Sequence, residues 1–358
     1  MVSYASLSEP VRNPRYEHKT YLIRWFIVAF LGLVNGSNAY LWISFAPIAD
    51  HFLAYYSTNE QFLNWVQLIF PITTVLLGLP AAFLVDRFGV RFVLVASVTV
   101  NLLCGLLRVM SSIASLNPFV GHRLALIIIG QLVASLAQPL CMFTPAKLAL
   151  DWFPENQRTI ANTIGSLGNA VGVLVGSAVA PLIVQRPEDI PVFNYISLGL
   201  VGVDFIVCCL MVRRGKPPIP PSDAAAILDE FHQREIQPEN FCAIRCFKNF
   251  ILQCIEPLRS RDFFLLMLTF GCGLAYFTTL STLFQQILCT KGYSNQFAGL
   301  CGSLMIATGL IASIFSAIFA DRTGLLLEAM QVGSHARRLV LNKLMPPNPI
   351  KCRPLEVV

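Results

Sequence analysis

Long apolar segments that recur along the chain constrain its fold more than any other feature of the sequence. Each is about 20 residues long, which is the length that a helix needs to cross the hydrocarbon core of a bilayer, and short polar segments separate them. Charged residues make up only 13% of the chain, against roughly a quarter in an ordinary soluble domain. The sequence therefore predicts an all-α integral membrane protein that crosses the bilayer several times.

Eight transmembrane helices are predicted from these segments. The first follows a polar, basic stretch and is too long for a cleavable signal peptide, so we expect it to remain in the membrane. The predicted spans are residues 25–49, 62–85, 92–114, 124–148, 160–184, 192–212, 263–288 and 298–320.

Basic residues indicate the orientation of these spans. When the segments between spans are assigned alternately to the two sides, all but four of the 26 Lys and Arg residues fall on one side. The positive-inside rule assigns that side to the cytoplasm, together with both termini and the long polar segment after the sixth span. The net charge of +6 is thereby explained by topology, and nucleic-acid binding is not expected. The four exceptions are Arg108, Arg123, Arg186 and Lys291.

The predicted organisation has five parts. A cytoplasmic N-terminal segment precedes a six-helix half, and a proline-rich cytoplasmic linker leads to a partial second half with two helices and a cytoplasmic tail. The boundaries are 1–24, 25–212, 213–261, 262–324 and 325–358. Cysteines in the linker have the wrong spacing for a zinc site, and palmitoylation is the better hypothesis for them.

A short loop pattern, Asp-Arg-x-Gly, follows both the second and the eighth span. In such a loop the Asp can cap a neighbouring helix, the Gly permits a tight turn, and Arg pairs with acids or lipid phosphates. One copy would be an ordinary basic turn, but two copies six spans apart favour the internal symmetry of a secondary transporter. The residues concerned are Asp86, Arg87, Gly89, Arg91, Asp321, Arg322 and Gly324.

The first of these loops resembles the signature loop between the second and third helices of the major facilitator superfamily, and the resemblance covers about residues 20–324. It implies a helical bundle with a substrate cavity between two halves. Glycines at helical spacing in the fifth span support it, and we expect them to allow close helix packing. They are Gly165, Gly168, Gly172 and Gly176.

Three segments are similar to one branch of that superfamily, the feline leukaemia virus subgroup C receptor-related family. Residues 37–50 are nearest to an orphan member of the family, and residues 137–139 and 167–169 are similar to the family as well. The resemblance implies a solute carrier that moves a small organic solute by alternating access. It implies neither an enzyme nor a cofactor.

The resemblance also supplies candidate substrate-binding residues. Asn38 and Trp42 lie four residues apart and therefore on one face of the first span. In the family such a pair resembles a choline-type site, in which the indole holds a quaternary ammonium by cation–π attraction. Gln138 and Tyr276 match a cavity-lining Gln and an aromatic residue of the family. The alternative, that Asn38 bonds across helices and Trp42 packs in the bundle, stays open.

The remaining polar residues of the spans divide into two groups. Asp204 is the only carboxylate well inside a span, so it is a candidate for proton coupling, although its place toward the cytoplasmic end also lets it reach water. The amides of the other group are expected to bond between helices. These are Asn64, Gln67, Asn101, Gln131 and Asn169.

Other chemistries are disfavoured by what the sequence lacks. There is no phosphate-binding loop for an ATP-driven pump and no metal-ligand cluster. All five His residues lie outside the apolar centres, which disfavours an axial ligand for heme export.

The predicted number of helices departs from the family pattern. Superfamily members have twelve helices, so the second half would lack four of them and one wall of the cavity. Two hypotheses follow. The chain either transports a choline-like or vitamin-like solute, or it is a truncated, alternatively spliced form that does not transport and binds a second copy or a full-length form. The plasma membrane is the default location for either, and an organelle membrane is the alternative.

Overall fold

The computed structural model describes residues 18–113, 119–212, 215–227, 243–289 and 295–323. Within these ranges the chain is helical and has no β-strand, as predicted. The chain divides into two compact units, Met1–Ile306 and Ala307–Val358. All the contacts described below lie within the first unit.

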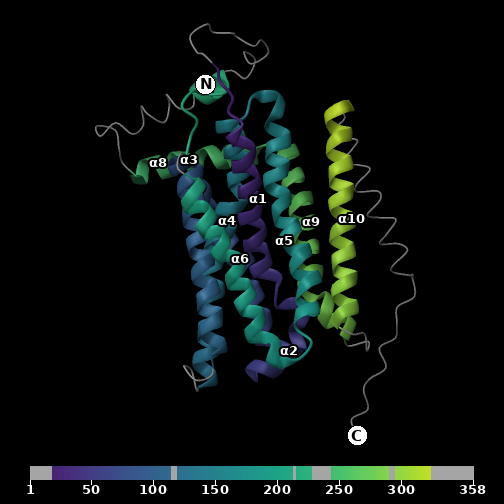
Figure 1. Ribbon diagram of the computed structural model, residues 1–358. Helices are drawn as coiled ribbons and strands as arrows, with labels where there is room; N and C mark the ends of the chain where they lie inside the picture. Colours follow the sequence, from purple (N-terminus) through teal and green to yellow (C-terminus); the bar gives the residue numbers. More distant parts are fainter. Residues whose placement is uncertain (1–17, 114–118, 213–214, 228–242, 290–294, 324–358) are drawn as a thin grey trace, which may run out of the picture. The chain divides into compact units, whose positions relative to one another are not determined.

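Helices lie at each of the eight predicted spans (Figure 1). Six described helices are long and apolar enough to cross a membrane, and α10 contains a shorter apolar stretch, Phe297–Ala312. The helices are α1 Ile23–Ile43, α2 Ala49–Tyr56, α3 Glu60–Ser112, α4 Val120–Trp152, α5 Arg158–Ile183, α6 Ile190–Met211, α8 Ala243–Ile255, α9 Arg261–Cys289 and α10 Asn295–Thr323.

Helix α3 contains both the second and the third predicted spans. Its 53 residues would extend about 80 Å if straight, far more than the roughly 30 Å of a bilayer core. Gly89 interrupts it with a φ of 73° and a ψ of 178°, a conformation that residues with a Cβ rarely adopt. The first Asp-Arg-x-Gly loop is therefore a kink between two membrane crossings.

The first span ends earlier than predicted. Helix α1 stops at Ile43, and a 3₁₀ turn at Ala46–Ile48 precedes the short helix α2. Pro47 accounts for the break, because it has no N–H to donate to the carbonyl of Ile43 and its ring clashes with a continuing helix. Helix α2, which the sequence analysis did not predict, buries Phe52 completely.

Helix α1 occupies the centre of the six-helix half and packs closely on α5 (Figure 1). A Cβ placed on Gly168 would lie 2.1 Å from the carbonyl oxygen of Gly32, and one on Gly172 would lie 2.0 Å from that of Gly36. Only glycines allow the two backbones to approach so closely. The predicted packing role is confirmed for Gly168 and Gly172.

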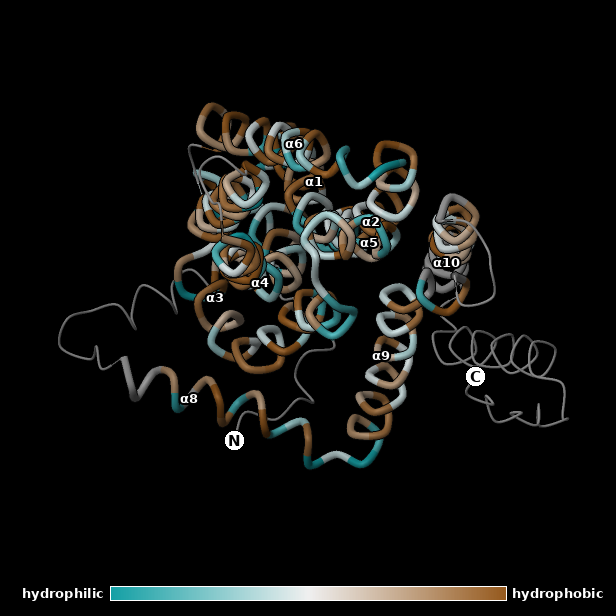
Figure 2. The backbone as a smooth tube through the Cα atoms, turned by 90° about the horizontal axis from the view of Figure 1, so that it is seen from below, coloured by the Kyte–Doolittle hydropathy of each residue, from teal (hydrophilic) through white to brown (hydrophobic). Residues whose placement is uncertain are grey.

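Large apolar side chains remain exposed around the bundle, as a lipid-facing surface requires. Val75 is 82% exposed, Leu76 70% and Leu210 62%. Figure 2, seen along the helices, shows hydrophobic residues making up much of the long helices. This surface agrees with the predicted multi-pass membrane protein.

Some predicted features fall outside the described residues. These are most of the N-terminal segment, part of the linker (228–242), Gly324 and the tail 325–358. The backbone of Asp321 and Arg322 forms part of the last turn of α10. The five domain boundaries stay predictions.

Candidate functional site

A cavity of about 290 Å³ lies between α1, the first half of α3, and α9. The described side chains that line it are all uncharged and come from one aromatic, several polar and three apolar residues. They are Trp42, Asn64, Gln67, Leu68, Pro71, Thr278, Thr279, Thr282 and Leu283.

Trp42 is fixed in this cavity by an unusual hydrogen bond. Its indole Nε1 donates to the backbone carbonyl of Gln67 at 3.2 Å. That carbonyl is free to accept because Pro71, four residues later, has no N–H to donate to it within the helix. The edge of the indole is therefore held by α3, while Trp42, only 5% exposed, still lines the cavity.

Two amide side chains of α3 complete one wall. Gln67 is 3% exposed, and its buried Nε2 has no hydrogen-bond partner among the described residues. Asn64 Oδ1 accepts a hydrogen bond of 3.0 Å from Gln286 Nε2 of α9. This bond ties the two walls of the cavity together.

The opposite wall carries three threonines on α9. The Thr278 hydroxyl donates to the carbonyl of Leu274 at 3.0 Å, and the Thr282 hydroxyl donates to that of Thr278 at 3.0 Å. Because these donors are used within the helix, the hydroxyl oxygens face their surroundings chiefly as acceptors. The wall is therefore mildly polar and slightly electronegative.

The structure brings only one of the four predicted substrate-binding residues to this cavity. Trp42 lines it, whereas Asn38 is fully buried and donates to Asn101 Oδ1 at 2.8 Å and to the carbonyl of Ala134 at 3.0 Å. Gln138 is 9% exposed and Tyr276 47% exposed, and neither is among the lining residues.

The signal that sequence reasoning missed lies in α3. Asn64 bonds to Gln286 of α9 as predicted, but both Asn64 and Gln67 also line the cavity beside Trp42. The proline four residues after Gln67 indicates a free carbonyl at that position, and this could have drawn attention to it. Bonding between helices is confirmed for Asn64, Asn101, Gln131 and Asn169, which contact Gln286, Asn38, Arg108 and Asn35 respectively.

Asp204 of α6 meets a single hydroxyl of α1. The side chain is 7% exposed, and its carboxylate lies within hydrogen-bonding distance of the Ser37 hydroxyl. The same hydroxyl lies 2.9 Å from the carbonyl oxygen of Leu33. The Ser37 hydroxyl therefore has two acceptors, the carboxylate of Asp204 and the carbonyl of Leu33, for its single proton.

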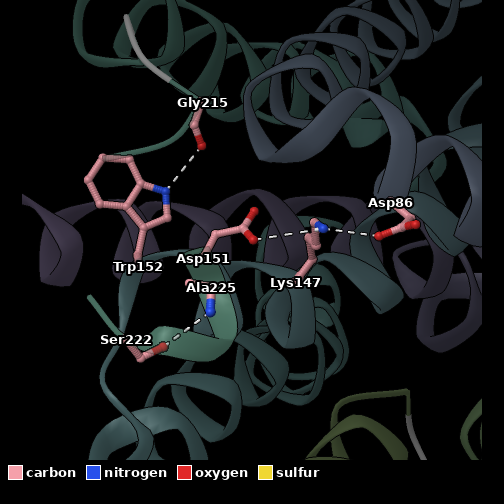
Figure 3. Close-up of polar contacts among 7 residues, drawn as sticks. All are labelled: Asp86, Lys147, Asp151, Trp152, Gly215, Ser222 and Ala225. Carbon is pink, nitrogen blue, oxygen red and sulfur yellow. Dashed lines mark hydrogen bonds and ion pairs between the residues drawn. The ribbon is translucent and has the colours of Figure 1, made fainter. Parts of the chain in front are cut away.

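The first Asp-Arg-x-Gly loop is joined to the end of α4 by charge (Figure 3). Lys147 Nζ lies 3.0 Å from the carboxylate of Asp86 and 3.8 Å from that of Asp151, and Lys147 and Asp151 are almost fully buried. Arg91 packs against Gly215, where an added Cβ would lie 3.3 Å from Arg91 Cβ. Asp86 therefore forms an ion pair with Lys147 of α4, and it also lies just before the kink at Gly89.

The start of the linker is held against the same end of the bundle. Trp152 Nε1 donates to the carbonyl of Gly215 at 3.2 Å (Figure 3), and Arg158 donates to the hydroxyl of Ser222 at 2.7 Å. That hydroxyl also accepts from the backbone N–H of Ala225 at 3.3 Å. Residues 215–227 of the predicted linker are therefore part of the packed structure.

Comparison with known proteins identifies the family. A model of the Major Facilitator Superfamily matches residues 26–340. The chain belongs to the major facilitator superfamily. A crystal structure of a bacterial homologue of the human lysosomal transporter Spinster, inward-facing and unoccupied, has the same fold, with a TM-score of 0.59 at 14% identity. The match covers 85% of this chain and 64% of that one.

Relatives within the superfamily are members of solute carrier family 49. Member A3 of Xenopus tropicalis is 35% identical over 314 residues, which are 86% of this chain and 60% of that protein. The choline/ethanolamine transporter FLVCR2 of Homo sapiens is 26% identical over 308 residues, or 84% of this chain and 55% of that protein. The chain thus spans about 60% of the length of the first relative. These relatives confirm the predicted branch, and they are transporters rather than enzymes.

Proposed function

We propose that this superfamily member binds a small organic cation of the choline and ethanolamine class beside Trp42 and carries it across the membrane by alternating access. The observation that supports this most is the cavity itself, where an indole with its N–H already bonded lines a space with only uncharged side chains. A relative with 26% identity is a choline/ethanolamine transporter.

The chemistry of the cavity suits such a solute. A desolvated cation over an indole face gains about 2 kcal/mol, and the threonine hydroxyl oxygens of α9 add acceptors around it. The buried Nε2 of Gln67, which has no partner among the described residues, would donate to the hydroxyl oxygen of choline or ethanolamine after turning into the cavity. At about 290 Å³ the cavity is at the small end of ligand sites, which favours a small solute.

Alternating access would require the hydrogen bond between Asn64 and Gln286 to form and break in each cycle. The positive-inside rule places Trp42 and Asn64 toward the outer side of the membrane, and the 3.0 Å bond joins α3 to α9 there. Opening toward the outside would require this bond to break. We infer that the described arrangement is closed on this side.

A second candidate function is that of a membrane protein that binds a partner chain without transporting. The observation that favours it is the exposure of α9, because none of its most apolar segment, Arg261–Leu283, is buried. A second copy or a longer form could cover this surface. Uptake measurements distinguish the two functions.

Replacing Trp42 by alanine is expected to lower choline uptake on the order of tenfold to thirtyfold, because about 2 kcal/mol of cation–π attraction is lost. Trp42→Phe keeps an aromatic face and should retain part of the uptake. The measurement is saturable uptake of radiolabelled choline and ethanolamine into cells that express the chain, normalised to surface protein.

Trp65→Ala is the matched control, since Trp65 lies 59% exposed and does not line the cavity. It should leave uptake nearly unchanged. Unaltered uptake in Trp42→Ala would refute the binding site. No uptake by the well-expressed parent chain would favour the partner-binding function.

Proton coupling through Asp204 is a separate part of the proposal. If the carboxyl exchanges a proton during transport, uptake by the parent chain should rise as the external pH falls, and Asp204→Asn should remove this dependence. Asp189→Asn is the control, because the side chain of Asp189 accepts backbone hydrogen bonds from Gln185 and Arg186 in an exposed turn and has no other hydrogen-bond partner in the described part of the chain. Uptake that is independent of pH in the parent chain would instead indicate a uniporter.

A further inference from the structure

Helix α8 has the features of a helix that lies in the membrane interface. Hydrophobic residues recur at spacings of three and four, at Phe247, Phe250, Ile251 and Cys254, which places them on one face. Lys248, on the other face, is exposed. Such a helix normally lies along the boundary between headgroups and acyl chains.

The contacts of α8 place it at that boundary. The ring of Phe83 lies 5.3 Å from that of Phe247 and 5.6 Å from that of Phe250. Phe83 is three residues before Asp86, at the end of the first membrane crossing of α3, and Figure 1 shows α8 running across the long helices. The positive-inside rule assigns this end to the cytoplasm.

A surface cavity of about 300 Å³ lies where the chain turns from this boundary into α9. Arg259 and Arg261 contribute two guanidinium groups, and neither makes an ion pair with another described residue. Phe264 and Leu265, which are 49% and 60% exposed, continue the lining along the first turn of α9. The remaining lining residues are Leu258 and Ser260.

We propose that this cavity binds an anionic phospholipid of the cytoplasmic leaflet. The planar guanidinium groups of Arg259 and Arg261 hold the headgroup phosphate by paired hydrogen bonds, and the first acyl chain lies along Phe264 and Leu265. Two independent features of the site fit a lipid better than a free anion, since the cationic part lies at the headgroup level and the apolar part continues into the membrane.

The charge of the segment selects an anionic lipid rather than a zwitterionic one. Residues 243–261 contain four basic side chains and one acidic one, Glu256. Basic clusters beside a membrane-spanning helix attract the anionic lipids of the cytoplasmic leaflet. The proposal is independent of the transported solute, because the lipid site is formed by other residues than the cavity at Trp42.

Native mass spectrometry of the purified full chain tests this site. Phosphatidylserine and phosphatidylcholine with the same acyl chains are added in turn, and the bound lipids are counted. We expect a preference for phosphatidylserine, which falls on the order of tenfold or more in the double variant Arg259→Gln with Arg261→Gln. The variant Arg259→Lys with Arg261→Lys keeps both charges but has no planar fork, so it should keep part of the preference. This partial binding would also show that substitution at these positions does not prevent folding.

The control is Arg186→Gln with Lys291→Gln, which removes two positive charges from segments assigned to the other side of the membrane. It should leave the preference unchanged. Equal binding of the two lipids, a preference that survives the glutamine pair, or an equal loss in the control would each overturn the site. Displacement of phosphatidylserine by inorganic phosphate would also overturn it, because it would indicate a site for a free anion.

Discussion

Alanine at Gly172 is expected to destabilise the six-helix half by about 3 kcal/mol, at the upper end of the usual effect of overpacking. The added Cβ would lie 2.0 Å from the carbonyl oxygen of Gly36 and 2.6 Å from its carbonyl carbon. Both obstacles are backbone atoms, so no side-chain rotation relieves the clash and α1 and α5 must separate. Thermal unfolding of the detergent-purified protein should show a midpoint lower by roughly 6–12 °C.

Gly199→Ala provides the matched control for this substitution. Gly199 lies in α6, where an added Cβ meets nothing within 4 Å. Since alanine favours a helix by up to about 1 kcal/mol over glycine, the control should be neutral or slightly stabilising. Equal midpoints for the two variants would show that α1 and α5 do not pack as closely as described.

Arg108→Met is expected to cost about 3–5 kcal/mol, because it removes the donor from several buried acceptors at once. The guanidinium is fully buried and donates to Ser44 Oγ at 2.9 Å, to Gln131 Oε1 at 3.0 Å and to the carbonyl of Leu41. It also lies 4.3 Å from the centre of the Phe45 ring. The expected result is a strongly lowered unfolding midpoint and reduced expression.

Two further variants test the reason for this effect. Arg108→Lys keeps the charge but has no planar fork to reach three acceptors, so an intermediate loss is expected. Arg186→Met removes an exposed arginine and should change the midpoint little. If Arg108→Met proved as stable as Arg186→Met, the end of α1 would not depend on the buried cation.

The length and polarity of the spans were predictable, and Pro47 indicates the break after α1 that the predicted first span overlooked, but the place of Arg108 was not predictable. Apolar length locates membrane crossings because the bilayer imposes it. Arg108 was counted among the exceptions to the positive-inside rule, as though it faced the outside. Arg108 is buried because the carbonyl of Leu41 and the side chain of Gln131 approach it from other helices. The residues that neighbour Arg108 in the sequence do not indicate these contacts.

The candidate site was predictable only in part for a related reason. Trp42 was recognised from a resemblance and lines the cavity. Asn38, on the same face of α1, points its amide to Asn101 and Ala134 instead. Which amide meets a cavity and which meets a neighbouring helix depends on how each helix is rotated in the bundle, and spacing along one helix cannot fix that rotation. The threonines of α9 were missed because α9 packs against the 3₁₀ turn Ala46–Ile48 only in the folded chain.

The central position of α1 has a consequence for synthesis of the protein. This helix is inserted first, yet its buried polar side chains find their partners much later in the chain, from Asn38 with Asn101, 63 residues on, to Ser37 with Asp204, 167 residues on. At about 5–20 residues per second of translation, these groups remain without their final partners for roughly 3–30 s. During that interval the insertion machinery must shelter α1, and a nascent chain that stalls before α6 emerges would present the unpaired polar side chains of α1 to the quality-control system of the membrane.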